Sequence, residues 1–174
     1  MKMNFKQNSV KLAIAAGLVG GSLSVTLPVF AVTGTTDLIV KASIGNACVL
    51  TTDELNFSTY DPNASTDHTV STKIKTTCTN GTTGTIKIGV GLNGTGENTA
   101  PTRRMLHTTV SDKYLNYDVY TDEARNVQWN HTDDKALSGT GSETFVTVYG
   151  EIPKGQTTAI AGDYKDTLVV TINY

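Results

Sequence analysis

The side chains that could do chemistry in this chain are few and lie far apart. His68, His107 and His131 occur in different local contexts, so they supply neither a metal-ligand set nor a base beside a nucleophile. The adjacent acids Asp122–Glu123 and Asp133–Asp134 would point to opposite faces of a strand, and in a loop such pairs are more often simply solvated. The sequence also contains no GxSxG elbow and no HExxH motif. We therefore expect no catalytic residues, no metal site and no cofactor.

Residues 1–31 have the character of a signal peptide. Three lysines come first, a mostly apolar run follows over 12–30, and small residues surround Ala31. Glycines, serines and a proline interrupt the run, which argues against a transmembrane anchor. We therefore expect an exported mature chain that begins at Val32 and has no membrane span.

The composition describes one small, acidic domain. The chain has 174 residues, of which 38% are hydrophobic and 17% charged, and this suits a single globular domain. It carries 14 Lys and Arg against 16 Asp and Glu, and the leader takes three of the lysines away, so the mature chain is clearly acidic. Because nucleic acids demand a basic face, we exclude a nucleic-acid partner.

Cys48 and Cys78 are the only cysteines. An even number of cysteines in an exported protein predicts a disulfide, and a pair of thiol metal ligands is the weaker alternative. Closing a loop of about 30 residues should stabilise the fold by roughly 3 to 4 kcal/mol in the chain-entropy model.

The elements that must carry these residues are strands. Threonine, valine, isoleucine and tyrosine are abundant, and apolar residues recur with a period of two. This alternation predicts strands over residues 47–50, 70–78, 85–92, 114–121, 145–152 and 167–174, with loops over 58–67 and 93–103. Several short strands and turn-rich connections indicate an antiparallel β-sandwich with Greek-key links.

The N-terminal segment of the mature chain also alternates. One face of an extended Thr36–Ile44 would carry Thr36, Leu38, Val40, Ala42 and Ile44. A strand at a free N-terminus is poorly placed to join its own core unless something pins it, so we expect its partner to be another molecule. Ala42 and Ile44 could instead belong to the strand that carries Cys48.

The C-terminal segment also alternates, and we expect its apolar face to have no following strand to cover it. Its apolar face would carry Leu168, Val170, Ile172 and Tyr174. A sandwich would often place another strand beside such a segment, and an uncovered apolar edge is an aggregation hazard.

Several stretches resemble the spore coat protein U family, which includes the subunits of archaic chaperone–usher pili. Gly162–Tyr174, which reads GDYKDTLVVTINY, is similar to the characteristic ending of that family. Weaker similarities lie at residues 32–34 (VTG), 55–57 (LNF), 117–120 (YDVY) and 149–152 (YGEI). Together these stretches span nearly all of the mature chain.

The resemblance implies an all-β, incomplete immunoglobulin-like Greek-key sandwich that lacks its last strand. Residues 32–44 would form a donor strand, and residues 45–174 the pilin domain. Strand addition of this kind is a known mode of chaperone–pilin recognition. The five alternating residues of the N-terminal segment would be plugs that fill a neighbour's groove, and Leu168, Val170, Ile172 and Tyr174 would lie on the strand that borders it.

The same resemblance implies partners and a location. The partners would be a periplasmic pilus chaperone, an outer-membrane usher and neighbouring pilin subunits. The chain would then pass through the periplasm to a cell-surface fimbrium that supports adhesion or biofilm formation.

Two alternatives from other classes compete with this interpretation. A secreted hydrolase would need the motifs that the sequence lacks. A secreted monomeric β-sandwich, acting as a surface-binding or spore-coat or matrix module, would close its sandwich with its own N-terminal strand. Composition does not exclude this second alternative, but size-exclusion chromatography would separate a lone monomer from a polymer.

Overall fold

The structure is a computed structural model that describes residues 33–97, 99–132 and 135–174. Contacts divide the chain into two units, Met1–Lys41 and Ala42–Tyr174. In the first unit, residues 33–41 form neither helix nor strand. The expected signal peptide, residues 1–31, lies outside the described residues, and the domain boundary between residues 44 and 45 stays a prediction.

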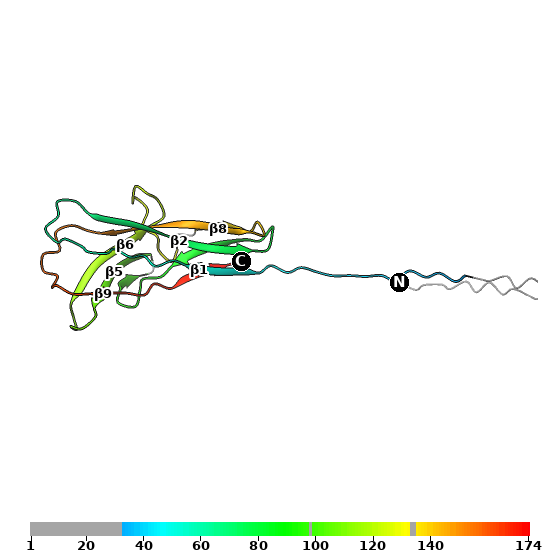
Figure 1. The fold of residues 1–174 in the computed structure, drawn as a ribbon, viewed down its shortest axis with the longest axis horizontal. Coiled ribbons are helices and arrows are strands. Elements are labelled where there is room, and N and C mark those ends of the chain that lie inside the picture. Colours follow the sequence, from blue (N-terminus) through cyan, green and yellow to red (C-terminus); the bar gives the residue numbers. More distant parts are fainter. Residues whose placement is uncertain (1–32, 98, 133–134) are drawn as a thin grey trace, which may run out of the picture. The chain divides into compact units, whose positions relative to one another are not determined.

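The second unit is built from antiparallel strands, and Figure 1 shows their arrangement. The described strands are β1 (Cys48–Thr52), β2 (His68–Cys78), β3 (Thr83–Ile88), β4 (Thr95–Glu97), β5 (Ala100–His107), β6 (Tyr114–Tyr120), β7 (Lys135–Ser138), β8 (Glu143–Ile152), β9 (Tyr164–Lys165) and β10 (Val170–Asn173). One sheet has the order β1-β2-β8-β6-β5-β4, with β9 paired to β5, and the other has the order β10-β3-β7. The predicted all-β fold of antiparallel sheets is therefore confirmed.

The alternation in the sequence explains the core. Inward residues of the two sheets are buried together with two residues from connections, and the cluster comprises Phe57, Ile74, Ile86, Ile88, Leu115, Tyr117, Val119, Trp129, Val148 and Ile152. Trp129 comes from a connection rather than from a strand, yet it is fully buried and its indole N–H donates to the carbonyl of Ile86 at 3.3 Å. The core thus includes a side chain that strand periodicity does not identify.

The structure corrects four local expectations. The loop predicted over 93–103 contains β4 and the first half of β5, and residues 135–138 form β7, a strand that the alternation does not predict. The strand predicted over 85–92 ends at Ile88, and of the strand predicted over 167–174 only Val170–Asn173 forms β10. After β3, Gly91 adopts a left-handed backbone conformation (φ 93°), which interrupts the extended backbone expected through residue 92.

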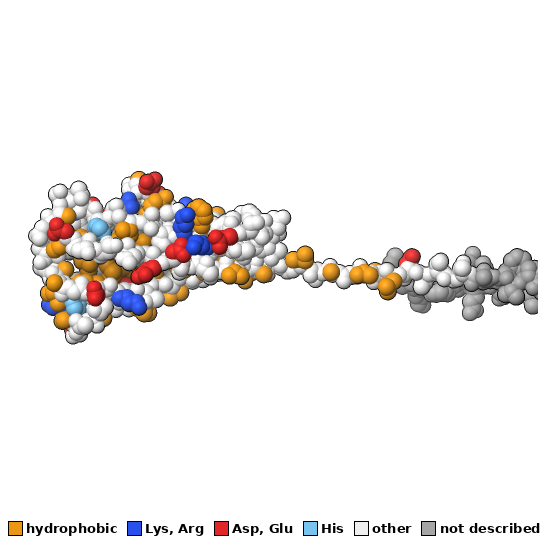
Figure 2. Space-filling model, viewed as in Figure 1, with side chains coloured by type: hydrophobic (Ala, Val, Ile, Leu, Met, Phe, Trp, Pro, Cys, Tyr) orange, Lys and Arg blue, Asp and Glu red, His pale blue; other side chains and the backbone are white. Residues whose placement is uncertain are grey.

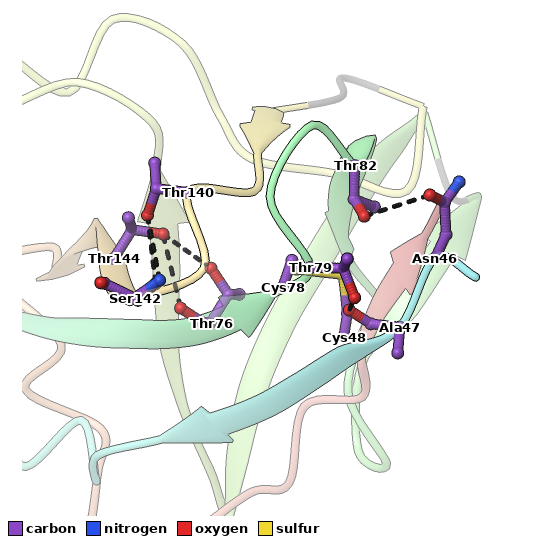
Figure 3. Close-up of a disulfide and its surroundings, with 10 residues drawn as sticks. All are labelled: Asn46, Ala47, Cys48, Thr76, Cys78, Thr79, Thr82, Thr140, Ser142 and Thr144. Atoms are coloured by element: carbon purple, nitrogen blue, oxygen red, sulfur yellow. Dashed lines mark hydrogen bonds between the residues drawn. A yellow bond between two sulfur atoms is a disulfide. The ribbon is translucent and has the colours of Figure 1, made fainter. Parts of the chain in front are cut away.

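The expected disulfide joins β1 to β2 (Figure 3). Cys48 and Cys78 lie directly opposite each other in the register, with Cα atoms 4.1 Å apart. Beside them, the backbone N–H of Thr79 donates to the carbonyl of Ala47 at 2.9 Å. The bond therefore fixes the first residue of β1 to the last residue of the strand beside it.

No helix among the described residues is long and apolar enough to cross a membrane.

Candidate strand-accepting groove

Two of the sheet edges, one from each sheet, are candidates for accepting a strand. β1 ends the larger sheet and β10 ends the smaller one. Within the described part of the chain, β1 pairs only with β2, and β10 pairs only with β3. Each edge therefore presents a row of backbone groups that another extended segment could bind.

The direction of these backbone groups follows from the hydrogen bonds already made. In β1, the N–H of Asp53 donates to Lys73 and the carbonyl of Ala47 accepts from Thr79, so the odd-numbered residues face β2. In the second edge, the carbonyl of Val169 accepts from the N–H of Gly89 at 2.9 Å, so there too the odd-numbered residues face the partner strand. Because residues alternate along an antiparallel ladder, the even-numbered residues direct their N–H and C=O groups to the open side.

The same even-numbered residues point inward. Leu50 in the first edge and Leu168, Val170 and Ile172 in the second are half-buried and pack against the core. On each edge, the residues with open backbone groups therefore also carry the incompletely covered apolar side chains. A strand added to either edge could therefore bind its open backbone groups and cover its apolar side chains.

Two adjoining cavities form a groove between the segments that follow β1 and precede β10. Their volumes are about 730 Å³ and about 630 Å³. The walls that they share are formed by Glu54, Leu55, Phe57, Met105, Asp163 and Tyr164. Figure 2 shows hydrophobic side chains in a hollow at this position.

Core residues form the floor of the larger cavity. Ile74, Ile88, Tyr117 and Val148 line it, although each of them is at least 95% buried. The open space therefore reaches the hydrophobic core itself. An apolar side chain that enters here would contact core residues and leave water.

Asp166 anchors the wall of this cavity beside β10. Its carboxylate accepts hydrogen bonds from the Tyr117 hydroxyl at 2.8 Å and from the backbone and side-chain amides of Asn93, each at 3.0 Å. The backbone of Gly91 approaches so closely that a Cβ at this position would collide with the carboxylate. Asp166 belongs to the GDYKDTL stretch, which is similar to the family's characteristic ending. That similarity singles out the stretch but does not indicate these contacts.

Burial and the hydrogen bond to Asp166 together raise the pKa of Tyr117 far above its ordinary value. Desolvation opposes the phenolate, and the neighbouring carboxylate favours a phenol that can donate. Tyr117 therefore holds Asp166 as a neutral donor throughout the physiological range.

His107 supports the other end of this wall. Its Nδ1 accepts from the backbone N–H groups of Thr109 and Val110, both at 3.1 Å, so Nε2 carries the proton that is donated to the carbonyl of Ala161 at 3.2 Å. The ring contacts Tyr164 edge to face at a centroid distance of 5.0 Å. At Gly162 (φ 142°), a Cβ would overlap the imidazole. The glycine and tyrosine of the GDY stretch are thus adapted to a buried histidine.

The opposite wall depends on another glycine. Leu55 and Phe57 pack over Gly150 in β8, where a Cβ would lie 2.9 Å from both side chains. The LNF and YGEI stretches, far apart in the sequence, therefore form one contact. This packing brings the segment after β1 across the sheet and sets the position of the groove.

A buried arginine in β5 links β6 to the residue that follows β3 and to the connection that carries Trp129. Arg103 forms an ion pair with Asp118 at 2.7 Å and donates to the carbonyls of Gly89 at 2.9 Å and Trp129 at 2.6 Å. Its side chain is completely buried. In the sequence, Arg103 is only the end of an expected loop, because nothing in its local pattern indicates burial.

The structure places the predicted plug residues in a segment without strand pairing. Residues 33–47 form no strand and are exposed, and Leu38 and Val40 are 88% and 84% exposed. The same holds for Thr36, Ala42 and Ile44. Their role as plugs stays a prediction.

The predicted edge residues divide into two groups. Leu168 and Val170 line the larger cavity, whereas Ile172 packs on the core outside it. Tyr174 lies beyond the end of β10 and is 55% exposed. Of these four residues, Leu168 and Val170 are the ones that line this cavity, and their role in contacting a donor or a chaperone stays a prediction.

The side chains considered for chemistry have structural surroundings. Nε2 of His68 lies 2.6 Å from the carbonyl oxygen of Phe57. Asp122 accepts from the N–H groups of Asn126 and Val127, and these bonds lower the pKa of its carboxyl group. Asp133–Asp134 lies outside the described residues. In the part of the chain that is described, no group of three or more His, Cys, Asp or Glu residues could hold a metal ion.

Two sequence comparisons cover most of the chain. The family model described as Spore Coat Protein U domain matches residues 32–171. Protein U of Myxococcus xanthus is 36% identical over 180 residues, which cover 96% of this chain and 99% of that protein.

A structural comparison supports the fold. A chain in the crystal structure of the CsuC–CsuE chaperone–tip adhesion subunit pre-assembly complex, from the archaic chaperone–usher Csu pili of Acinetobacter baumannii, is similar with a TM-score of 0.55. The sequence identity is 19%, and the match covers 74% of this chain and 40% of that chain. At this identity, the likeness concerns the fold alone.

Proposed function

The chain belongs to the Spore Coat Protein U domain family, and from this premise we propose that it is a structural fibre subunit that polymerises by donating a strand. The observation that carries the proposal is the groove whose floor is the hydrophobic core. It lies between two edges on which open backbone groups and half-buried apolar residues coincide. A family of structural subunits also favours a role other than catalysis.

The donor would be residues 32–44 of a second copy, and residues 45–174 would form the accepting domain. Leu38 and Val40 would be the main plugs, with Thr36, Ala42 and Ile44 on the same face. Burying a large apolar side chain stabilises a junction by about 1.5 to 3 kcal/mol before ordering costs are subtracted. Backbone hydrogen bonds to the open edges would add register.

Before assembly, the groove needs a temporary occupant, because an open apolar edge promotes aggregation. We assign this role to a periplasmic chaperone, followed by an outer-membrane usher that adds the subunit to a surface fimbrium. The solved complex of a chaperone with a tip adhesion subunit, whose fold is similar, supports this route. Adhesion or biofilm formation would be the purpose of the fibre.

The plug residues provide the direct test. Leu38→Asp or Val40→Asp would carry an unpaired charge into an apolar pocket, so we expect at least a tenfold (~1.4 kcal/mol or more) loss of sedimentable fibre, with subunit retained in the periplasm. Ser43→Asp is the matched control, because it adds the same charge to the opposite face of the same segment. Immunoblots of sheared fibre and periplasmic fractions measure both pools.

Normal fibre yield from both plug variants would disprove the donor role. A soluble, heat-stable monomer from the unmodified chain would favour the alternative of a self-closed surface or matrix module.

A further inference from the structure

One apolar side chain of the donor segment lies on its otherwise polar face. Ile39 lies between the plugs Leu38 and Val40, and successive side chains of a strand point to opposite faces. Its neighbours on the polar face are Asp37 and Lys41. Ile39 is 75% exposed, and it would point away from any groove that the plugs enter. Filling the groove therefore does not explain an isoleucine here.

A corresponding apolar side chain interrupts the polar outer face of the accepting edge. Val169 lies between the half-buried Leu168 and Val170 and is 63% exposed. The same outer face carries Thr167 and Thr171. Because the carbonyl of Val169 already accepts from Gly89, its backbone groups face β3.

Val169 is therefore a non-hydrogen-bonded position toward any strand that adds to this edge. All strand pairs in the described part of the chain are antiparallel. If a donor continues this pattern, the residue facing Val169 has its Cα about 4.5 Å away, which is the closest side-chain approach in such a sheet.

The larger cavity points independently to the register. Leu168 and Val170 line this cavity, but Ile172 does not. If the two main plugs enter it opposite these residues, Leu38 faces Val170 and Val40 faces Leu168 in an antiparallel pair. The residue between the plugs then faces the residue between Leu168 and Val170.

We propose that Ile39 of one copy packs against Val169 of a second copy on the outer face of the completed sheet, and that this pair sets the register of the junction. The proposal rests on the proposed function, and the occupant of the edge is a second copy of this chain. Two observations carry the proposal. Ile39 and Val169 are both exposed, and each lies between two residues that would face the groove.

Disulfide trapping tests the pair directly. Fibres of the double variant Ile39→Cys with Val169→Cys should give, after mild oxidation, a covalent ladder on non-reducing gels. Peptide mapping should identify the bond between positions 39 and 169 and show that Cys48–Cys78 is intact. The native disulfide shows that a directly opposite pair of this kind is close enough, because its Cα atoms are 4.1 Å apart.

Two matched controls test the register and the surface. Ile39→Cys with Thr171→Cys places the second thiol at a diagonal position, about 7–8 Å away, and a disulfide needs Cβ atoms about 3.5–4.5 Å apart, so at least about tenfold less ladder is expected. Ile39→Cys with Phe145→Cys uses an exposed apolar position on β8, in the other sheet, and should give none.

The outcomes separate this proposal from the proposed function. A ladder from the Thr171 pair that equals or exceeds that of the Val169 pair overturns the register. The absence of a 39–169 bond in fibres that still require Leu38 overturns the pair but leaves strand donation intact. A 39–169 bond within one chain, seen as an oxidised monomer, overturns the second copy as the partner of Val169 and favours a sandwich closed by its own N-terminal strand.

A pair of opposite charges introduced at positions 39 and 169 tests the same contact without new cysteines. Ile39→Glu alone should lower fibre yield, and Val169→Lys in the same chain should restore it, because facing opposite charges attract across a strand pair. Failure of Val169→Lys to restore any yield, while Val169→Lys alone assembles normally, would contradict the contact.

Discussion

At the scale of single residues, the groove depends on a hydrogen bond between its floor and its wall. The hydroxyl of Tyr117 in β6 donates to Asp166, which also binds Asn93. The carboxylate thus gathers donors from two separate parts of the chain and holds the segment that leads into β10. Gly91 leaves the space that this arrangement needs.

The raised pKa of Tyr117 predicts a specific alkaline weakness. An unfolded tyrosine titrates near pH 10, whereas the folded protein keeps Tyr117 protonated well above that pH. Above about pH 10 the unfolded state therefore binds fewer protons than the folded state, and the free energy of unfolding falls as pH rises, by up to about 1.4 kcal/mol per pH unit. Below pH 10 this residue should cause no pH dependence.

Tyr117→Phe should make this decline shallower. Guanidinium unfolding at several values between pH 8 and 11.5 measures the slope, and Tyr174→Phe, at a largely exposed ring, is the control. The Tyr117→Phe protein should also lose stability at pH 8, because Asp166 loses a donor. Equal slopes for this variant and the unmodified chain would show that another group is responsible for the decline.

At the scale of elements, the strands with strong alternation were the predictable ones. β2, β6, β8 and β10 carry apolar residues on one face, so the period of two in the sequence is enough to identify them. β4 and β7 are short and contain few apolar residues, so they give no such signal, and they exist because longer strands pair with them. Tertiary pairing therefore decides these elements.

The candidate site was predictable in part, for the same physical reason. The alternating faces of residues 36–44 and 168–174 identify possible plugs and a possible edge. The cavity floor, the Asp166 contacts and the burial of Arg103 and His107 depend on residues brought together from distant segments. A single polar residue in a sequence carries no signal of such contacts.

The link between β1 and β2 supports a prediction at this scale. Replacing Cys48 and Cys78 together by serine should lower the free energy of unfolding by about 3 to 4 kcal/mol, because the unfolded chain regains the freedom of a loop of about 30 residues. Denaturant unfolding of both proteins measures the difference. The reduced and alkylated native chain is a useful comparison, since it changes the bond but keeps the sequence. A loss below about 1 kcal/mol would contradict the expected constraint.

At the scale of the whole molecule, the proposed function gives each copy one donor segment and one groove, which are unlike surfaces. Contacts of this head-to-tail kind give open chains when the rotation between copies does not close a ring. Under the proposed function, each added copy buries one groove and leaves another open. Fibre length is then set by supply and by whatever occupies the last groove.

A free donor segment should therefore stop growth. We expect a synthetic peptide of residues 32–44 to shorten fibres assembled from purified subunits, in proportion to its concentration, because it competes for the groove by mass action. The same peptide with Leu38→Asp should be inactive. Electron microscopy of fibre lengths provides the measurement, and equal shortening by both peptides would contradict groove competition.

The position of the disulfide has a mechanical consequence. Cys48 is the first residue of β1, and residues 45–47 connect it to the segment proposed as the donor. Without this bond, a pulling force transmitted through that segment would break the β1–β2 hydrogen bonds one after another, starting at Cys48. The covalent bond to Cys78 instead passes the tension to β2, which is paired along its length with β8. If the chain forms fibres as proposed, the β1 edge is thereby protected from peeling when the fibre is under load.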